Sequence, residues 1–306
     1  IGERVLTTPK HYAYVKISEG CSRNCSFCAI PLIRGKHVSK PKGEIINEVK
    51  FLAKQGVKEV ILIAQDLTWY GLDIYKKREL PDLLNRISEI EGIQWIRLHY
   101  TYPANFPTGL LNVMHNNSKV CLYLDIPLQH ISSRILRSIK RGLGGHKTID
   151  LIKKIKRTIP NVALRTTLIV GYPGETEEEF EQLLDFVMES KFDRLGVFIY
   201  SPEEDTSAFT LKDNIPDEIK ESRRDRLMML QQEISYELNK QKVGSAMKVI
   251  IDSKEGDKYI GRTEFDSPEV DNEVIIKAPK NSLKIGEYYN VIISGSDFFD
   301  LYGEVI

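Results

Sequence analysis

Stretches with helical spacing of apolar residues alternate with short apolar runs over the first two thirds of the chain. Residues 12–17 are aromatic and β-branched, as strands are, whereas residues 44–55 repeat apolar positions at intervals of four and three, as amphipathic helices do. Residues 57–64 form a continuous apolar run, which is typical of a parallel strand buried on both faces. The same reasoning predicts helices at 80–90, 132–140, 148–159 and 177–190, and strands at 93–101, 120–128, 162–170 and 194–200. Six strands in this alternation indicate a parallel α/β architecture, either an open sheet or a partial barrel.

The pattern changes after Pro216. Residues 217–242 are rich in Glu, Arg, Leu and Met and predict one long helix, and beyond it the apolar period switches to two. Short strands separated by Gly, Asn, Asp and Pro predict a small antiparallel barrel, with strands at 247–252, 259–263, 274–277, 289–294 and 301–306. We therefore divide the chain into three parts: an α/β domain at 1–215, a connecting helix at 216–242 and a β-barrel domain at 243–306.

Composition places the chain among globular proteins. Its 306 residues are 42% hydrophobic with a mean hydropathy of −0.28, which provides ample core material. No run approaches the ~18 apolar residues of a membrane-spanning helix and no signal peptide opens the sequence, so we expect no membrane. The formal net charge is zero, which excludes a chain-wide basic surface for nucleic acid. Residues 243–306 nevertheless hold seven Lys/Arg and twelve Asp/Glu, a balance of −5, and residues 1–242 carry the compensating +5.

Three of the four cysteines, Cys21, Cys25 and Cys28, lie within eight positions just after the first predicted strand. Thiolates at this C-x₃-C-x₂-C spacing can share one iron–sulfur cluster, and three of them leave one iron of a 4Fe–4S cubane open for a cofactor or substrate. The alternatives are coincidence, or a structural zinc site completed by His11 or His37. Clustered thiols without a disulfide framework indicate a reducing compartment, so we expect a cytoplasmic protein.

Several further stretches accompany the cysteine loop Gly20–Pro31. They are Arg34-Gly35 with Ser39-Lys40-Pro41, Gln65-Asp66-Leu67-Thr68 with Tyr70-Gly71, Pro127-Leu128-Gln129, and the run from Arg165 to Thr176. Together they resemble the methylthiotransferase branch of the radical S-adenosylmethionine (SAM) superfamily, and residues 243–306 resemble its C-terminal TRAM domain. The resemblance implies a partial (βα)6 TIM-like barrel of the radical SAM type followed by the small TRAM β-barrel. It also implies that the three cysteines are the catalytic, metal-binding residues and that SAM binds the open iron.

The resemblance further implies a set of cofactor-binding positions at the strand ends. They are Phe27, Ala29, Gln65, Asp66, Gln129, Arg165, Ile169, Glu175 and Tyr200. Structural explanations compete: Gln65 and Asp66 can cap a strand end, and Thr176 can cap a helix after a glycine turn. Arg165 within an apolar strand needs an anionic partner if it is buried, either the cofactor carboxylate or a structural acid. Cys121, inside another apolar strand, is expected to be a small buried hydrophobe.

Two substrate classes are open within this branch: an isopentenylated adenosine in tRNA, and the β-carbon of an aspartate in small-subunit ribosomal protein twelve. An RNA-binding barrel should be basic, whereas this one is acidic. We therefore predict the ribosomal protein, with tRNA as the alternative. The acidic run is either a soluble loop or a docking face for a basic partner, with Glu264, Asp266, Glu269, Asp271 and Glu273 as its residues.

The reaction that the resemblance implies begins with one electron entering the cluster. SAM is then cleaved to methionine and a 5′-deoxyadenosyl radical, which abstracts hydrogen from the substrate carbon while the protein orients the reactants and excludes water. A second 4Fe–4S cluster is expected on an N-terminal domain that we do not find in these 306 residues, and electrons are expected from an external donor. A hypothesis of another class stays open, a non-catalytic iron–sulfur or RNA-binding module. The donor, the form of the sulfur and the oligomeric state do not follow from the sequence.

Overall fold

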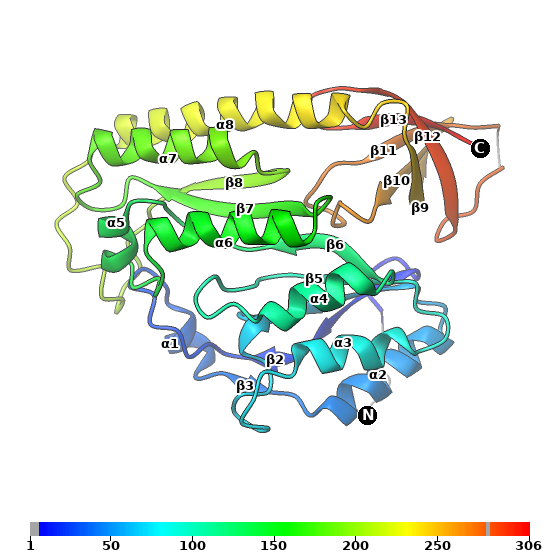
Figure 1. Cartoon of the computed structure of the whole chain (residues 1–306), viewed down its shortest axis with the longest axis horizontal. Coiled ribbons are helices and arrows are strands. Elements are labelled where there is room, and N and C mark those ends of the chain that lie inside the picture. The colour runs from blue at the N-terminus through cyan, green and yellow to red at the C-terminus, as the bar shows by residue number, and fades with distance from the viewer. Residues whose placement is uncertain (1–5, 280–281) are drawn as a thin grey trace.

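A computed structural model describes residues 6–279 and 282–306, so residues 1–5 of the first predicted domain lie outside the described residues. Six parallel strands form one sheet in the order β1-β4-β5-β6-β7-β8, with β1 and β8 at its edges (Figure 1). The predicted parallel α/β architecture is confirmed. The strands are β1 (Tyr12–Lys16), β4 (Glu59–Ile63), β5 (Trp95–Leu98), β6 (Val120–Asp125), β7 (Ala163–Val170) and β8 (Arg194–Ile199), and a separate two-stranded sheet pairs β2 (Ser18–Glu19) with β3 (Val38–Ser39).

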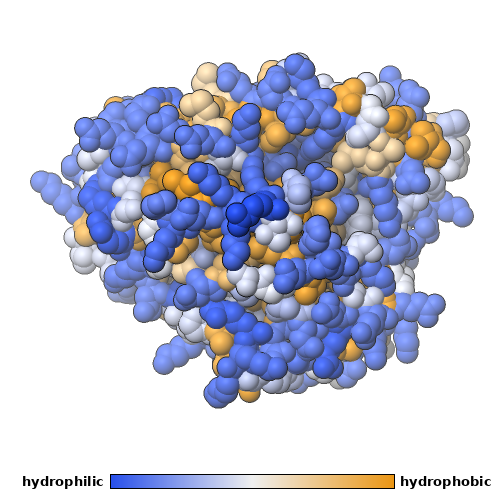
Figure 2. Space-filling view, viewed as in Figure 1, coloured by the Kyte–Doolittle hydropathy of each residue, from blue (hydrophilic) through white to orange (hydrophobic). Residues whose placement is uncertain are grey.

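Helices lie between successive strands and cover one face of the sheet, where apolar side chains of both form the main core. They are α1 (Ile30–Arg34), α2 (Lys42–Lys54), the 3₁₀ turn η1 (Leu67–Trp69), α3 (Leu80–Ser88), α4 (Thr108–Asn116), α5 (Ser133–Ser138), α6 (Gly145–Thr158) and α7 (Glu177–Ser190). The pattern did not predict α4, which is short, follows Pro107 and has no side-chain cap. Among the described residues, no helix combines the length and apolar composition that crossing a bilayer demands. Figure 2 shows hydrophobic residues on this face as patches among hydrophilic ones.

The start of α7 is set by a capping box. The Thr176 hydroxyl accepts the Glu179 backbone N–H, and the Glu179 carboxylate accepts the Thr176 backbone N–H. The first turn also carries three glutamates, Glu177 to Glu179, whose negative charges interact favourably with the positive N-terminal end of the helix dipole. The predicted capping role of Thr176 is therefore confirmed, and it fixes the loop between β7 and α7.

A long helix, α8 (Asp217–Lys240), leads to a closed five-stranded barrel (Figure 1). The barrel strands run in the order β10-β11-β13-β12-β9. The prediction of a purely antiparallel barrel is wrong at one pair, because β11 and β13 are parallel. Five strands in a closed ring cannot all alternate in direction, so one parallel pair is required. The strands are β9 (Ala246–Glu255), β10 (Lys258–Thr263), β11 (Val274–Lys277), β12 (Tyr288–Ser296) and β13 (Leu301–Val305).

Residues 262–272, from the end of β10 to the start of β11, form a plug segment against the sheet face opposite the helices. Arg97 on β5 donates to the Glu264 carbonyl oxygen (2.7 Å), and Arg194 on β8 pairs with Asp266. The plug segment makes hydrogen bonds to each of the six strands. Its partners on the other four strands include Tyr12, Glu59, Tyr123 and Arg165. The barrel domain is thus joined to the sheet by polar contacts inside the molecule.

The centre of this junction is a buried ion network. Glu59 on β4 accepts from Arg97 Nε (2.7 Å) and from Arg262 Nη2 (2.8 Å), and all three residues are at most 2% exposed. Burial alone would raise the pKa of Glu59, but Arg262 and Arg97 outweigh it and lower the pKa to about 2. The carboxylate therefore stays ionised between two arginines, one from each domain.

Candidate active site

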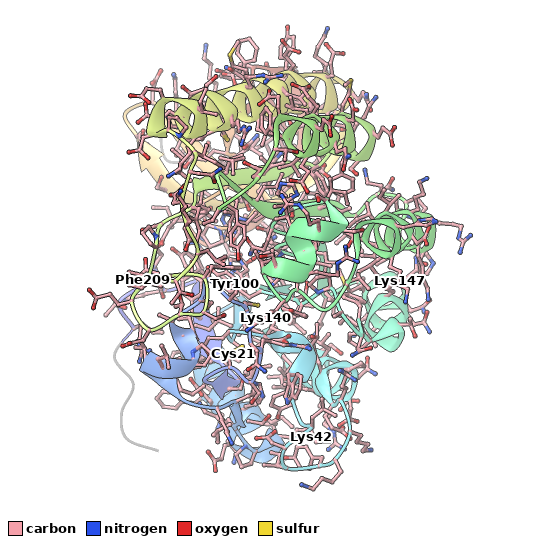
Figure 3. The ribbon with its side chains drawn as sticks, turned by 90° about the vertical axis from the view of Figure 1, so that its left-hand side faces the viewer. Cys21, Lys42, Tyr100, Lys140, Lys147 and Phe209 are labelled. Atoms are coloured by element: carbon pink, nitrogen blue, oxygen red, sulfur yellow. The ribbon has the colours of Figure 1, made fainter. Side chains whose placement is uncertain are left out.

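A cavity of about 320 Å³ lies at the carboxyl ends of the sheet strands, where parallel α/β folds place their ligands. The cysteine loop, the segments after β4, β5 and β6, strand β7 and Val270 of the plug segment line it. Figure 3 faces this end of the molecule, and two lining residues, Cys21 and Tyr100, lie near the centre of the view. The cavity therefore runs from the cysteine loop toward the plug segment.

The cysteine loop presents three thiols to this cavity. Cys21, Cys25 and Cys28 are free and half-buried, and all three line the cavity. The loop closes tightly at Gly20, whose φ is +75° and where an added Cβ would meet the Lys36 carbonyl oxygen at 2.3 Å. Only glycine suits both demands. Burial raises the pKa of Cys21 and of Cys28, so these thiols stay protonated until a metal binds and releases their protons.

The zinc alternative does not fit the histidines. His11 bonds Asp252 of the barrel (2.7 Å), and His37 bonds Ser39 (3.1 Å). Within residues 6–279 and 282–306, no three His, Cys, Asp or Glu side chains converge as ligands of one metal ion. Three thiols around a shared cavity fit a cluster instead, because a cluster brings its own sulfides and spans a wider gap than one ion.

Two arginines and a tyrosine, which the sequence analysis did not identify, stand beside the thiols. The guanidinium carbons of Arg23 and Arg141 lie 3.9 and 4.2 Å from the ring centre of Tyr102. Arg141 Nη1 is 3.6 Å from Cys25 Sγ, and the Tyr102 hydroxyl is 3.8 Å from the same sulfur. No local motif connects these three positions, since the fold alone brings them together. They place two positive charges beside the expected cluster.

Several polar atoms around the cavity are buried without a hydrogen-bond partner among the described residues. They are donors on Arg23 (Nη2) and Arg141 (Nε) and acceptors on Gln65 (Oε1) and Asp125 (Oδ1). Leaving such a group unpaired costs about 1–3 kcal/mol, so four of them around one cavity fit a polar ligand. Donors and acceptors together suit a molecule that carries both an ammonium and a carboxylate, as SAM does. The residues present therefore fit both the cluster and SAM.

The end of the cavity away from the thiols is called its floor here. Arg165 on β7 and Asp125 on β6 lie there, next to the plug segment. Arg165 Nη1 donates to Asp271 (3.1 Å), and its Nε lies 3.9 Å from Asp125 at the end of β6. Burial raises the pKa of Asp125 to about 6, although Arg165 opposes the shift. Burial, with Arg97 and Arg165, lowers the pKa of His99 to about 3, so its imidazole is neutral at physiological pH.

Comparison with protein families agrees with this geometry. Residues 15–187 match the radical SAM superfamily, and residues 243–306 match the TRAM domain. Curated proteins named ribosomal protein uS12 methylthiotransferase RimO are 57% identical over 304 residues in Flavobacterium johnsoniae and 56% identical over 305 residues in Phocaeicola vulgatus. The matches span 99% of this chain and 70–71% of those proteins. The chain belongs to the RimO family.

Solved structures agree on the fold. Coproporphyrinogen III oxidase (HemN) from Escherichia coli, a radical SAM enzyme, matches with a TM-score of 0.57 at 16% identity, over 84% of this chain and 68% of that one. SuiB from Streptococcus suis, bound to S-adenosylmethionine, matches with a TM-score of 0.51 at 18% identity, over 73% of this chain and 48% of that one. At these identities the likeness shows that this RimO-family chain has the radical SAM fold.

Four of the nine expected cofactor-binding residues line the cavity: Phe27, Gln65, Gln129 and Arg165. Gln129 has a positive φ of 74°, and its backbone N–H and C=O form hydrogen bonds with Thr167 and Ile169 of β7. Gln129 therefore lies in the cavity wall between the end of β6 and strand β7. Their roles toward SAM stay predictions. Arg165 has the anionic partner that its burial requires, and that partner is an aspartate of the plug segment.

The other five, Ala29, Asp66, Ile169, Glu175 and Tyr200, lie outside the cavity lining. Asp66 caps η1 and holds Arg23 (2.9 Å), so it acts on the cavity through that arginine. Glu175 is buried and accepts from the Gly171 backbone and from Arg223, which fixes the loop after β7. Ile169 and Tyr200 pack in one apolar cluster with Phe27, and Ala29 precedes α1. Cys121 is buried as expected, at 1% exposure.

The predicted acidic docking face is wrong for Asp266 and Asp271, whose side chains are buried, and stays a prediction for the exposed Glu269 and Glu273. Asp266 is 1% exposed and paired with Arg194, and Asp271 bonds Tyr123 and Arg165. Glu264 and Glu269 also accept hydrogen bonds from the α/β domain, from the Leu122 backbone and the Tyr12 hydroxyl. Four of the five acids therefore bind groups of the α/β domain of the same chain, and two of these four pair with arginines. Of the five residues, Glu273 remains exposed without a bond into that domain.

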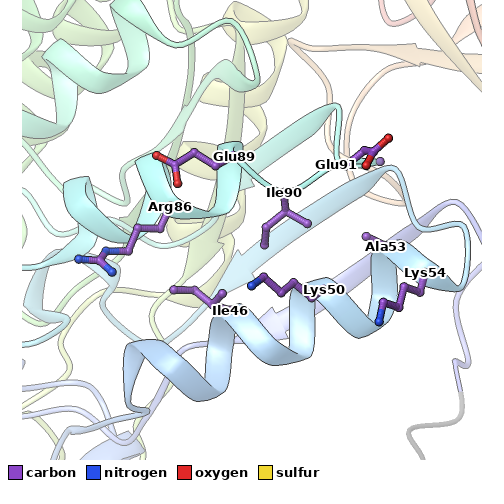
Figure 4. A pocket seen from close by; sticks show the side chains of 9 residues that line it. Ile46, Lys50, Ala53, Lys54, Arg86, Glu89, Ile90 and Glu91 are labelled. Atoms are coloured by element: carbon purple, nitrogen blue, oxygen red, sulfur yellow. The ribbon is translucent and has the colours of Figure 1, made fainter.

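A second, wider hollow of about 710 Å³ lies between α2 and α3 (Figure 4). Its walls carry positively charged side chains (Lys50, Lys54 and Arg86) and negatively charged ones (Glu89 and Glu91). None of the predicted site residues lines it.

Proposed function

We propose that this chain is the radical-generating part of a methylthiotransferase acting on the β-carbon of an aspartate in ribosomal protein uS12. The identity of 57% to curated RimO proteins over 99% of the chain carries the proposal. The cavity supports it, because three free thiols and unpartnered buried donors surround one space. The choice of uS12 over tRNA rests on that identity, since the acidic plug segment is used inside the molecule. With a ribosomal protein as substrate, we propose that the reaction takes place in the cytoplasm.

Each end of the cavity has its own task. Cys21, Cys25 and Cys28 would hold the 4Fe–4S cluster, which together with SAM supplies one-electron chemistry that no side chain provides. Arg23 and Arg141 keep buried N–H donors beside the thiols, and these suit the cofactor carboxylate. The Gln65 amide oxygen is an unpartnered acceptor that suits the cofactor ammonium. Gln129 and Thr167 add polar groups to the wall between these residues and the floor.

The complete reaction requires more than these residues provide. We propose a second 4Fe–4S cluster as the source of the sulfur and an external one-electron donor. This sequence has four cysteines, and Cys121 is buried in the sheet, so its thiols suffice for one cluster. We therefore expect these 306 residues to cleave SAM without forming the thiomethylated product.

Anaerobic reconstitution tests the proposal. The chain is loaded with iron and sulfide, and a chemical reductant and SAM are added with or without uS12. Formation of 5′-deoxyadenosine, stimulated by uS12 and not by tRNA, is the expected result. Tight binding of one zinc without iron, or stimulation by tRNA alone, would falsify it.

A further inference from the structure

The floor of the cavity holds a guanidinium with most of its donors free. Arg165 lines the cavity with 24% of its side chain exposed, and within the described residues its side chain makes one hydrogen bond, to Asp271. Its Nε is 3.9 Å from Asp125, which is too long for a hydrogen bond. A guanidinium presents five N–H donors in a planar fork, so Arg165 keeps a free edge for a carboxylate.

The other two arginines of the cavity are already engaged near the thiols. Arg23 donates to Asp66 and stacks on Tyr102, and Arg141 donates to the Pro127 carbonyl oxygen and lies against Cys25. Arg165 is the cavity arginine on the side of the plug segment. This division separates a cofactor end, at the thiols, from a floor that remains for the substrate.

We propose that Arg165 binds the side-chain carboxylate of the substrate aspartate, and that Asp271 of the plug segment holds the guanidinium in position. This inference rests on the proposed function, which supplies an aspartate as the reacting residue. A carboxylate held at Arg165 fixes the adjacent β-carbon, the reacting atom, in the cavity. Asp271 engages only the Nη1 donor of the guanidinium, through its Oδ1, because its Oδ2 already accepts from Tyr123 (2.7 Å) and from the Ser267 backbone (2.9 Å).

A polypeptide has a route to this floor. A third hollow, also of about 710 Å³, lies between β8, α8 and the barrel, and it shares Arg165 and Val270 with the cysteine cavity. Exposed apolar side chains border it: Met228, Met229, Val270 and Phe299. A segment of the substrate protein can therefore lie along α8 while its aspartate side chain reaches Arg165.

The test compares binding of two forms of purified uS12, one native and one with the substrate aspartate changed to asparagine. The chain is loaded with cluster and SAM but receives no reductant, so dissociation constants are measured without turnover. We expect the asparagine form to bind at least tenfold more weakly. Its side-chain amide is uncharged and replaces one accepting oxygen by an NH₂ donor, which cannot accept a hydrogen bond from Arg165. Arg165→Gln should weaken native uS12 similarly and lose the discrimination, and Arg165→Lys should keep part of it.

Arg86→Gln on the outer surface is the matched control and should leave both dissociation constants unchanged. Equal binding of the two uS12 forms by the wild type overturns the inference, even if the Arg165 variants do not fold. Discrimination that survives Arg165→Gln also overturns it. A third result would also overturn it: Arg165→Gln binds SAM more weakly but still discriminates between the two uS12 forms. Arg165 would then be a cofactor ligand. Failure of the wild type to bind uS12 at all is a failure of the proposed function, whereas binding without discrimination defeats this inference alone.

Discussion

On the sheet face opposite the helices, the buried polar groups near the carboxyl ends of the strands differ in their hydrogen bonding from those near the amino ends. At the carboxyl ends, Arg23, Gln65 and Asp125 keep buried atoms that have no hydrogen-bond partner in the described part of the chain. Toward the amino ends, Glu59 and Arg262 lie in a network that joins the plug segment to the sheet. Unpaired buried groups are tolerated where a ligand completes them, and paired charges hold domains together. The partners of a charged residue, more than its charge, therefore separate a binding site from a structural junction.

The largest effect is expected at the thiols. Cys25→Ser should abolish cluster binding and SAM cleavage while the chain still folds, because Cys25 is half-buried at the cavity and outside the main core. Iron content, the visible absorption of the cluster and 5′-deoxyadenosine formation are measured. Cys121→Ala is the control, since Cys121 lies in a separate apolar cluster, and it should keep the cluster. A full complement of iron in Cys25→Ser would contradict the assignment.

The next effect tests the junction. Glu59→Gln leaves Arg97 and Arg262 buried without their shared charge and should cost about 3–5 kcal/mol of unfolding free energy. Glu287→Gln removes an ion pair between the same domains at the rim, to Lys58 (2.6 Å), and should cost less than about 1 kcal/mol. Urea unfolding of the three proteins at neutral pH decides between them. Equal losses would show that the buried network is not special.

Acid sharpens this prediction. The pKa of Glu59 is lowered to about 2 in the folded chain, so its contribution is present above the usual pKa of a glutamate. It is lost as the pH falls toward 2. The stability difference between wild type and Glu59→Gln should therefore shrink below about pH 4, and a constant difference would point to a packing effect.

Hydrophobic periodicity predicted much of this fold because each element has its own local signal. The bounds Glu177–Ser190 of α7 and Val274–Lys277 of β11 agree with prediction, since a capping box and turn residues mark them. In contrast, α4 has no side-chain cap, and the parallel pair of β11 and β13 follows from ring closure, which no local pattern contains.

Part of the cavity lining was predictable, from the local cysteine motif and, for Gln65, Gln129 and Arg165, from the family resemblance. The spacing of Cys21, Cys25 and Cys28 indicated their shared role. Arg141 was missed because its contacts, to Cys25 and to the Pro127 carbonyl, form only in the folded chain. Asp266 was misassigned for the same reason, because an acidic run looks alike whether it meets solvent or a buried arginine.

Asp125 offers a smaller, pH-dependent effect at the cavity. Burial raises its pKa to about 6, so the folded chain holds this proton more tightly than the unfolded chain does. Stability should therefore fall by on the order of 2–3 kcal/mol as the pH rises from about 4 past 6. Asp125→Asn should lack this fall, whereas Asp150→Asn on the exposed face of α6 should retain it. Urea unfolding without cluster or SAM at several pH values measures it, and parallel curves for wild type and Asp125→Asn would refute it.

The smallest effect is expected at Glu273, which we compare with Asp266 of the same acidic run. Glu273 is exposed, and burial together with Asp300, Glu255 and Asp252 raises its pKa, so its charge is mildly unfavourable in the folded chain. Glu273→Gln should therefore leave the unfolding free energy within about 0.5 kcal/mol of wild type, on the stabilising side at neutral pH. Asp266→Asn, which leaves Arg194 unpaired, should destabilise by several times that amount. Urea unfolding of both variants measures the contrast. If Asp266→Asn were as neutral as Glu273→Gln, the plug segment would not join the domains through its charges, and a docking role for the run would reopen.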